Sequence, residues 1–180
     1  ISRPLPGMLV LRTEPRTDER GFFSRCFCRH ELGRFGVTPA VEQANLSFSE
    51  RAGTLRGLHY QLPPHPQGKL VRVVRGSVFD VAVDLRRSSP TFGRWVGVEL
   101  NADNHRQLWI PAGFGHGFLT LSDSADFLYK TTDYYAPQAE GCVRWNDPTI
   151  GIQWPDLGQD FKLTDKDAKA PLLADAKTFD

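Results

Sequence analysis

The chain has 180 residues, the length of one globular domain with a core of its own. Its 22 Lys and Arg against 21 Asp and Glu leave a net charge of +1, which excludes the basic excess typical of general nucleic-acid binders. Hydrophobic residues make up 40% and charged residues 24%, so wholesale disorder is excluded, and no apolar run is long enough to span a membrane. We expect no targeting segment, and the three cysteines favour a reduced, cytoplasmic setting.

The first predicted element is a strand over 21–27, which carries apolar residues on both faces. A strand of this kind near a terminus commonly pairs across a subunit interface, and the alternative is an edge strand covered by its own chain. A short helix is predicted over 30–35, ending near Gly36. Residues 1–40 are therefore expected to form an N-terminal arm.

Alternating apolar and polar residues predict a β core over 41–150. The clearest strand covers 78–85, where Phe79 and three further apolar residues share one face, and Asp80 and Asp84 lie on the other. Further strands are predicted over 53–61, 70–74, 95–100, 107–110, 116–121, 127–132 and 142–145. Residues 151–180 are expected to form a C-terminal segment with a helical turn at 165–170, so that 1–180 is a single domain. Many short strands separated by turn residues are typical of an all-β sandwich or barrel.

The segment 53–61 could carry chemistry because it holds an arginine and a histidine in an apolar strand. Arg56 and His59 are three residues apart and would face opposite sides of a regular strand, but Gly57 permits a bulge that changes this. A buried arginine is costly unless it binds an anion. The alternative is a surface arginine and a core histidine that bonds to backbone groups.

Two further strands hold candidate residues. Lys69 shares a strand face with Val71 and Val73, so it lies either on a solvated edge or at the opening of a cavity. Tyr129 lies in the middle of the strand over 127–132. Such a tyrosine most often packs with its hydroxyl on an acceptor, and a functional role would need a base opposite it.

The Pro-x-Gly-x-x-His spacing that ends at His116 resembles the second motif of the cupin barrels, and the spacing from Gly53 to His59 resembles the first. Metal-binding cupins continue the first motif as His-x-His, whereas this chain has Gln61 at that position. Two histidines and an amide fall short of a firm transition-metal site. We therefore expect a cupin, or double-stranded β-helix jelly-roll barrel, with short helical pieces at its ends and no metal. A histidine freed from metal is a natural general base.

Taken together, the motifs resemble the dTDP-4-dehydrorhamnose 3,5-epimerase family over residues 18–167. The matching segments are 55–61, 68–72, 78–84, 89–93, 109–111, 116–118, 129–132 and 147–148. The resemblance implies that His59 is the general base, Asp167 its carboxylate partner and Tyr129 the general acid, with Lys69 near the ketone oxygen. It further implies substrate-binding roles for Gln43, Asn45, Arg56, His116, Tyr135, Glu140 and Lys166, and for Arg20 and Phe23 from a neighbouring subunit.

The implied reaction is epimerisation at C3 and C5 of a dTDP-linked 4-keto-6-deoxyhexose, with no cofactor, in a homodimer with exchanged N-terminal arms. The alternatives are a mono-epimerase acting at C3 or C5 only, a metal-dependent cupin enzyme, and a non-catalytic sugar-nucleotide binder. The chain departs from the family at Arg25, where an acidic residue is usual, at Ala44, where Asp is usual, and at Gly115, where Ala is usual. The first two departures bear on the nucleotide and the exact substrate more than on the chemistry.

Overall fold

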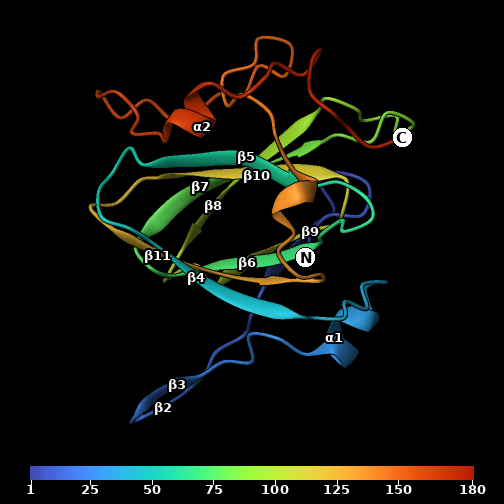
Figure 1. Cartoon of the computed structure of the whole chain (residues 1–180). Helices are drawn as coiled ribbons and strands as arrows, with labels where there is room; N and C mark the ends of the chain where they lie inside the picture. Colours follow the sequence, from blue (N-terminus) through green and yellow to red (C-terminus); the bar gives the residue numbers. More distant parts are fainter.

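Two five-stranded sheets lie face to face and form a jelly-roll barrel in the computed structural model, which describes residues 1–180 (Figure 1). The first sheet has the order β1 (Leu9–Arg12), β9 (Arg106–Ile110), β6 (Lys69–Arg75), β11 (Ala125–Thr131) and β4 (Gln43–Ser49). The second has the order β12 (Glu140–Cys142), β5 (Leu55–Gln61), β10 (Phe114–Thr120), β7 (Ser77–Asp84) and β8 (Trp95–Asn101). The predicted all-β class and jelly-roll barrel are confirmed.

The remaining elements are short. The hairpin of β2 (Arg16–Asp18) and β3 (Gly21–Phe23) projects from the barrel, and α1 (Arg29–Gly33) follows it (Figure 1). The 3-10 turn η1 (Pro137–Ala139) precedes β12, and α2 (Asp165–Ala168) lies in the C-terminal segment. Neither α-helix has the length or apolar character needed to cross a membrane.

The structure differs from the predicted elements near the N-terminus and at β12. The predicted strand over 21–27 is regular only in β3, and the strand predicted over 142–145 lies earlier, in β12. β1, from the segment expected to be an arm, pairs with β9 and completes the first sheet. β4 was not predicted as a separate strand although its residues alternate, and its apolar residues Leu46 and Phe48 face outward and are exposed.

Both faces of β7 are buried, and this determines where its aspartates lie. Val78 and Ala82 belong to the cluster between the two sheets, whereas Val81 and Val83 belong to a second cluster on the outer face of their sheet. Residues 143–180 supply the cover of that outer face, with Val143, Ile150, Leu173 and Ala176 in the same cluster. The strongly apolar face of the sequence pattern therefore points away from the barrel, and Asp80 points into it.

The bulge that Gly57 permits is present in β5. Between β5 and β10, His116 pairs with His59 and Phe118 pairs with Arg56, so β5 has one extra residue in this interval. Gly57 has a φ of +127°. The bulge allows both Arg56 and His59 to reach groups around the barrel interior, which a regular strand would forbid.

We expect Gly57→Ala to lower the free energy of unfolding by roughly 2–5 kcal/mol, because it combines an unfavourable φ with overpacking. A Cβ at this position would lie 2.5 Å from Gly117 Cα. Gly36→Ala is the matched control, because Gly36 also has a positive φ but its Cβ would meet no atom within 4 Å. It should cost only about 1–2 kcal/mol. Urea denaturation measures both, and equal losses would contradict the close approach of β5 and β10.

Candidate active site

A histidine–aspartate pair joins β5 to the C-terminal segment. His59 Nε2 lies 2.7 Å from Asp167 Oδ1, and Asp167 Oδ2 accepts a hydrogen bond of 3.2 Å from the backbone N–H of Gly57. Thr164 caps α2 by accepting from the N–H of Asp167, which holds the aspartate in place. The side chain of His59 is 33% exposed and that of Asp167 only 4%. The pair leaves His59 Nδ1 free to face a substrate.

The environment of Asp167 favours its ionised form. Burial alone would raise the pKa of this carboxyl, but the hydrogen bond and positive charge of His59 and the N–H of Gly57 outweigh it, so the pKa is lowered. The aspartate is therefore an anion at neutral pH. An anion on one ring nitrogen fixes the tautomer and stabilises the imidazolium that forms when the other nitrogen accepts a proton.

A second histidine–aspartate pair lies deeper in the barrel. His116 Nε2 is 2.9 Å from Asp80 Oδ2, and both side chains are buried. Burial raises the pKa of Asp80 and lowers that of His116, because desolvation disfavours both charged forms. Asp80 Oδ1 has no hydrogen-bond partner within the protein. His116 is thus anchored by the interior and placed beside His59 across the β5–β10 pairing.

Lys69 begins β6 on the face that carries Val71 and Val73 into the barrel. Burial lowers the pKa of Lys69 to about 8, and the negative charges of Asp80 and Glu140 oppose that shift. Lys69 therefore lies on the inward face of its sheet and not on a solvated edge. Below about pH 8 it provides a poorly hydrated cation among the candidate residues.

This pKa has a consequence for activity. Because Lys69 loses its charge as the pH rises through about 8, we expect kcat/KM to fall over the same range. Lys69→Met should lower kcat by about 10²–10³-fold at pH 7 and remove this alkaline limb. Its Tm should not decrease, because a desolvated ammonium is unfavourable to the fold. Lys169→Met, at an exposed lysine, is the control; an alkaline limb that persists in Lys69→Met would contradict the assignment.

Tyr129 lies in the first sheet, opposite the sheet that carries the His59–Asp167 pair. Tyr129 lies on β11 between Asn45 of β4 and Val71 of β6, and its ring packs against the barrel core. Burial raises the pKa of its hydroxyl, although the nearby positive charge of Arg56 opposes the shift. Tyr129 is therefore protonated at neutral pH and could donate a proton.

Arg56 bridges the two sheets. Its Nη2 donates to the carbonyl oxygen of Phe48 at 2.9 Å and its Nε donates to Ser49 Oγ at 3.4 Å, both on β4. The guanidinium is thus neither a free surface group nor unpaired. Its remaining N–H groups could serve an anionic ligand.

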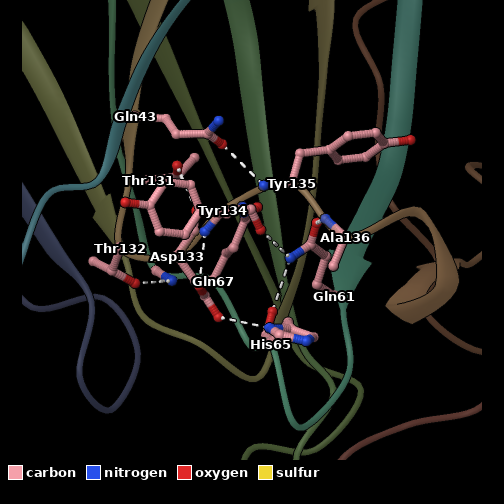
Figure 2. A network of polar contacts seen from close by, with 11 residues as sticks. Gln43, Gln61, His65, Gln67, Thr131, Thr132, Asp133, Tyr134, Tyr135 and Ala136 are labelled. Atoms are coloured by element: carbon pink, nitrogen blue, oxygen red, sulfur yellow. Dashed lines mark hydrogen bonds and ion pairs between the residues drawn. The ribbon is translucent and has the colours of Figure 1, made fainter.

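Glutamine side chains hold the loop that follows β11 (Figure 2). Gln43 Oε1 accepts from the N–H of Tyr135 at 2.9 Å, and Gln61 Oε1 accepts from the N–H of Ala136 at the same distance. Gln61 Nε2 donates to the carbonyls of His65 and Tyr134. The ring of Tyr135 is exposed on this fixed backbone. The structure therefore gives Gln43 a direct role in placing Tyr135.

Three predicted nucleotide-contacting residues lie together beside this loop. Lys166 Nζ is 2.5 Å from Glu140 Oε2, and the Tyr135 hydroxyl is 3.5 Å from the same oxygen. The ion pair raises the pKa of Lys166. A flat aromatic ring next to a lysine and a carboxylate is suited to a base linked to a phosphate group.

Two residues predicted to bind substrate do not lie near the His59–Asp167 pair. Arg20 pairs with Asp18 at the turn of the β2–β3 hairpin, and Phe23 is 64% exposed on β3. Figure 1 shows this hairpin extending away from the barrel and the C-terminal segment. Within one chain these residues contribute nothing to the site.

The residues usual in metal-binding cupins do not fit a metal here. Gln61, at the position of the second histidine, has both amide atoms bonded to the backbone of the 134–136 loop and of His65. His116 is bonded to Asp80, and it does not join His59 in a cluster of potential metal ligands. The three residues therefore form no ligand set.

The sequence pattern did not point to two neighbours of the site, the buried Asp80 and the half-buried Cys142. Asp80 was placed on the polar face of its strand, and only the cover over the other face shows that it points inward. Cys142 lies opposite His59 in the β12–β5 pairing. Burial, followed by the charge of Asp167, raises the pKa of the Cys142 thiol to about 12, so it is neutral. No signal in the sequence marked Cys142.

Two of the three departures from the family pattern, Arg25 and Gly115, have local explanations. Arg25 pairs with Glu31 at 3.3 Å, within the chain's own N-terminal region. A Cβ at Gly115 would lie 3.0 Å from Leu85 Cδ1, so the glycine gives Leu85 room. Ala44 is exposed on the outer face of β4, and nothing in the structure explains it.

Comparison with known proteins supports one family. The family model described as dTDP-4-dehydrorhamnose 3,5-epimerase matches residues 2–175. An enzyme of that name from Pseudomonas aeruginosa is 53% identical, with 94% of each chain covered. A Legionella pneumophila epimerase solved with dTDP-4-keto-L-rhamnose superposes with a TM-score of 0.91, at 48% identity over 97% of this chain and 92% of that one. A 3'-monoepimerase from Streptomyces bikiniensis, solved with dTDP-quinovose, gives 0.88 at 39% identity, over 96% and 88%.

Proposed function

Because the chain belongs to the dTDP-4-dehydrorhamnose 3,5-epimerase family, we propose that it inverts C3 and C5 of a dTDP-linked 4-keto-6-deoxyhexose in deoxysugar biosynthesis. The observation that carries the proposal is the pair of His59, on β5 of one sheet, with Asp167 of α2, while Tyr129 lies on the opposing sheet. A base and an acid on opposite sides of one interior are what inversion of a carbon centre requires.

The hydrogens at C3 and C5 are acidic because both carbons are next to the C4 ketone. His59 takes the proton from one face of the sugar ring, and the electron pair of the broken C–H bond forms an enolate with its charge on the C4 oxygen. Lys69 stabilises that oxygen. Tyr129 then gives its proton to the opposite face of the carbon, and the C4 ketone is restored. Each inversion leaves the oxidation state unchanged, so the proposed reaction needs no redox cofactor.

We also propose that the nucleotide lies beside the loop over 132–136. Tyr135 would stack on thymine, while Lys166 and Arg56 would lie near the diphosphate. Gln43, Asn45, His116 and Glu140 would line the sugar and nucleotide. The Legionella pneumophila relative was solved with a dTDP-keto-sugar, which supports this class of substrate.

One alternative has a specific observation in its favour. The 3'-monoepimerase from Streptomyces bikiniensis shares this fold, so the same residue types accompany inversion at one carbon. Incubation with dTDP-4-keto-6-deoxyglucose, reduction of the ketone and NMR of the sugar would decide. Inversion at both carbons supports the proposal, and inversion at C3 alone supports the alternative. A metal-dependent reaction would lose activity after EDTA dialysis, and a non-catalytic binder would return the sugar unchanged.

The chain is further proposed to act in the cytoplasm as a homodimer with exchanged N-terminal arms. The exchange of arms is supported by Arg20 and Phe23, which lie on a hairpin that extends away from its own barrel. The cytoplasmic setting is supported by the three cysteines, which form no disulfide. In an exchanged dimer the hairpin would reach the partner's active site. Leu46, Phe48 and Val74 are exposed large apolar residues, as expected of a surface that a second copy covers.

Exchange of arms predicts complementation between two inactive variants. Arg20→Ala and His59→Asn are each expected to be nearly inactive. When they are unfolded and refolded together, the heterodimer contains one intact site and one doubly defective site, so activity should return. Light scattering should report a dimer for each variant alone and for the mixture. A mixture that stays as inactive as its parents would contradict the contribution of Arg20 to a neighbouring site.

A further inference from the structure

Cys142 faces the proposed catalytic pair across two paired strands. Leu58 and Val143 exchange two backbone hydrogen bonds, of 3.1 and 3.0 Å, between β5 and the residue that follows β12. The next pair, His59 and Cys142, is therefore a non-hydrogen-bonded pair, the kind in which facing side chains lie closer together. Donor atoms of His59, Cys142 and Asp167 all lie within 4.8 Å of one another.

These donors have the chemistry of a zinc site. Imidazole nitrogen, thiolate sulfur and carboxylate oxygen bind Zn²⁺ at about 2.0–2.3 Å in a tetrahedral arrangement. The 2.7 Å separation of His59 Nε2 and Asp167 Oδ1 would open by a few tenths of an ångström, and Cys142 Sγ would move inward. Three protein ligands leave a fourth position for water. No other His, Cys, Asp or Glu residues of the chain form such a cluster.

One negative charge at the cluster remains without a cation of its own. Glu140 and Lys166 form an ion pair and offset each other, so Asp167 is the group that attracts a dication. The metal would replace the proton on the Cys142 sulfur, which leaves to solvent, so no oxidant or reductant is involved. A thiolate ligand selects zinc, cadmium or cobalt and disfavours magnesium and calcium.

We propose that His59, Cys142 and Asp167 form an inhibitory site for a zinc-class divalent cation. The cation binds Nε2 of His59 in place of its proton, so the imidazole proton moves to Nδ1, and this nitrogen can no longer take a proton from a substrate. This site differs from the His59, Gln61 and His116 positions that a metal-binding cupin would use. Binding of the cation rests on the geometry alone, whereas inhibition rests on the proposed role of His59 as the base.

Two measurements on EDTA-dialysed protein test binding of the cation and inhibition separately. Co²⁺ titration should produce thiolate-to-metal charge-transfer absorption in the wild type and in Cys28→Ser, but not in Cys142→Ser. Zn²⁺ should inhibit the wild type and Cys28→Ser reversibly, and Mg²⁺ should not. Cys142→Ser should keep its basal activity and require at least about tenfold more Zn²⁺, because loss of even an outer partner of a metal site costs 10–100-fold in affinity. Cys142→Ala and circular dichroism control for misfolding.

The outcomes are distinct. Absence of the cobalt band in the wild type, or its persistence in Cys142→Ser, would overturn the metal site, whatever the activity. A band that depends on Cys142 without inhibition would overturn the inhibitory role and count against His59 as the base. A band and inhibition that are both weakened by Cys142→Ser support the proposal.

Discussion

His59→Asn is expected to lower kcat by about 10²–10⁴-fold, because it removes the group that we propose takes the C–H proton. Asparagine keeps a polar side chain near Asp167, so the fold and substrate binding should persist. The free Nδ1 of His59 is lost, however, and no neighbouring base replaces it: His116 is bonded to Asp80 and the Cys142 thiol is neutral. Steady-state assays of NDP-sugar conversion measure the loss.

The matched control for this variant is His30→Asn. His30 lies exposed on α1, far from β5 in the sequence and outside every polar contact of the site. Its replacement should leave kcat and Tm unchanged. If His59→Asn retained more than about a tenth of wild-type kcat while His30→Asn was normal, another residue would have to be the base.

Tyr129→Phe should separate proton exchange from inversion. His59 can still remove a proton and return one to the same face, so solvent deuterium should enter the substrate. Delivery to the opposite face needs the Tyr129 hydroxyl, so formation of the inverted product should fall by about 10²–10⁴-fold. The raised pKa of Tyr129, caused by burial, keeps the wild-type hydroxyl protonated at the pH of the assay.

Tyr60→Phe is the control for loss of a buried hydroxyl. The Tyr60 hydroxyl donates to the carbonyl of Lys177 at 2.5 Å and anchors the C-terminal segment. Its loss should cost stability, about 1 kcal/mol, without uncoupling exchange from inversion. Equal ratios of exchange to inversion in Tyr129→Phe and in the wild type would remove Tyr129 from the role of acid.

The sequence predicts the barrel because most strands alternate and end at turn residues, and this part of the fold needs no tertiary information. It could not show that the more apolar face of β7 points outward. That outcome depends on residues 143–180, whose irregular chain has no periodicity but covers Val81 and Val83. The same cover turns Asp80 into the barrel, where it partners His116. A local sequence pattern does not show which face of a strand a distant segment will bury.

For the site, too, some features follow from the sequence and others depend on tertiary contacts. The sequence left open whether Gly57 introduces a bulge, and the β5–β10 register has one. The family resemblance paired His59 with Asp167, and the structure places them at 2.7 Å although they are 108 residues apart. Gln61 was interpreted as a missing metal ligand, and its contacts show why it is glutamine: it clamps the loop that carries Tyr135. Arg20 and Phe23 lie away from the site in a single chain, so their roles depend on a partner.

The most direct test of double epimerisation is NMR of the wild-type enzyme with dTDP-4-keto-6-deoxyglucose in D₂O. Removal of a proton by His59 and delivery from solvent-exchanged Tyr129 require deuterium at both C3 and C5 of the inverted product. We predict loss of both proton signals in the wild type and retention of both in His59→Asn. Deuterium at C3 alone, or an inverted product that keeps its original hydrogens, would contradict the account.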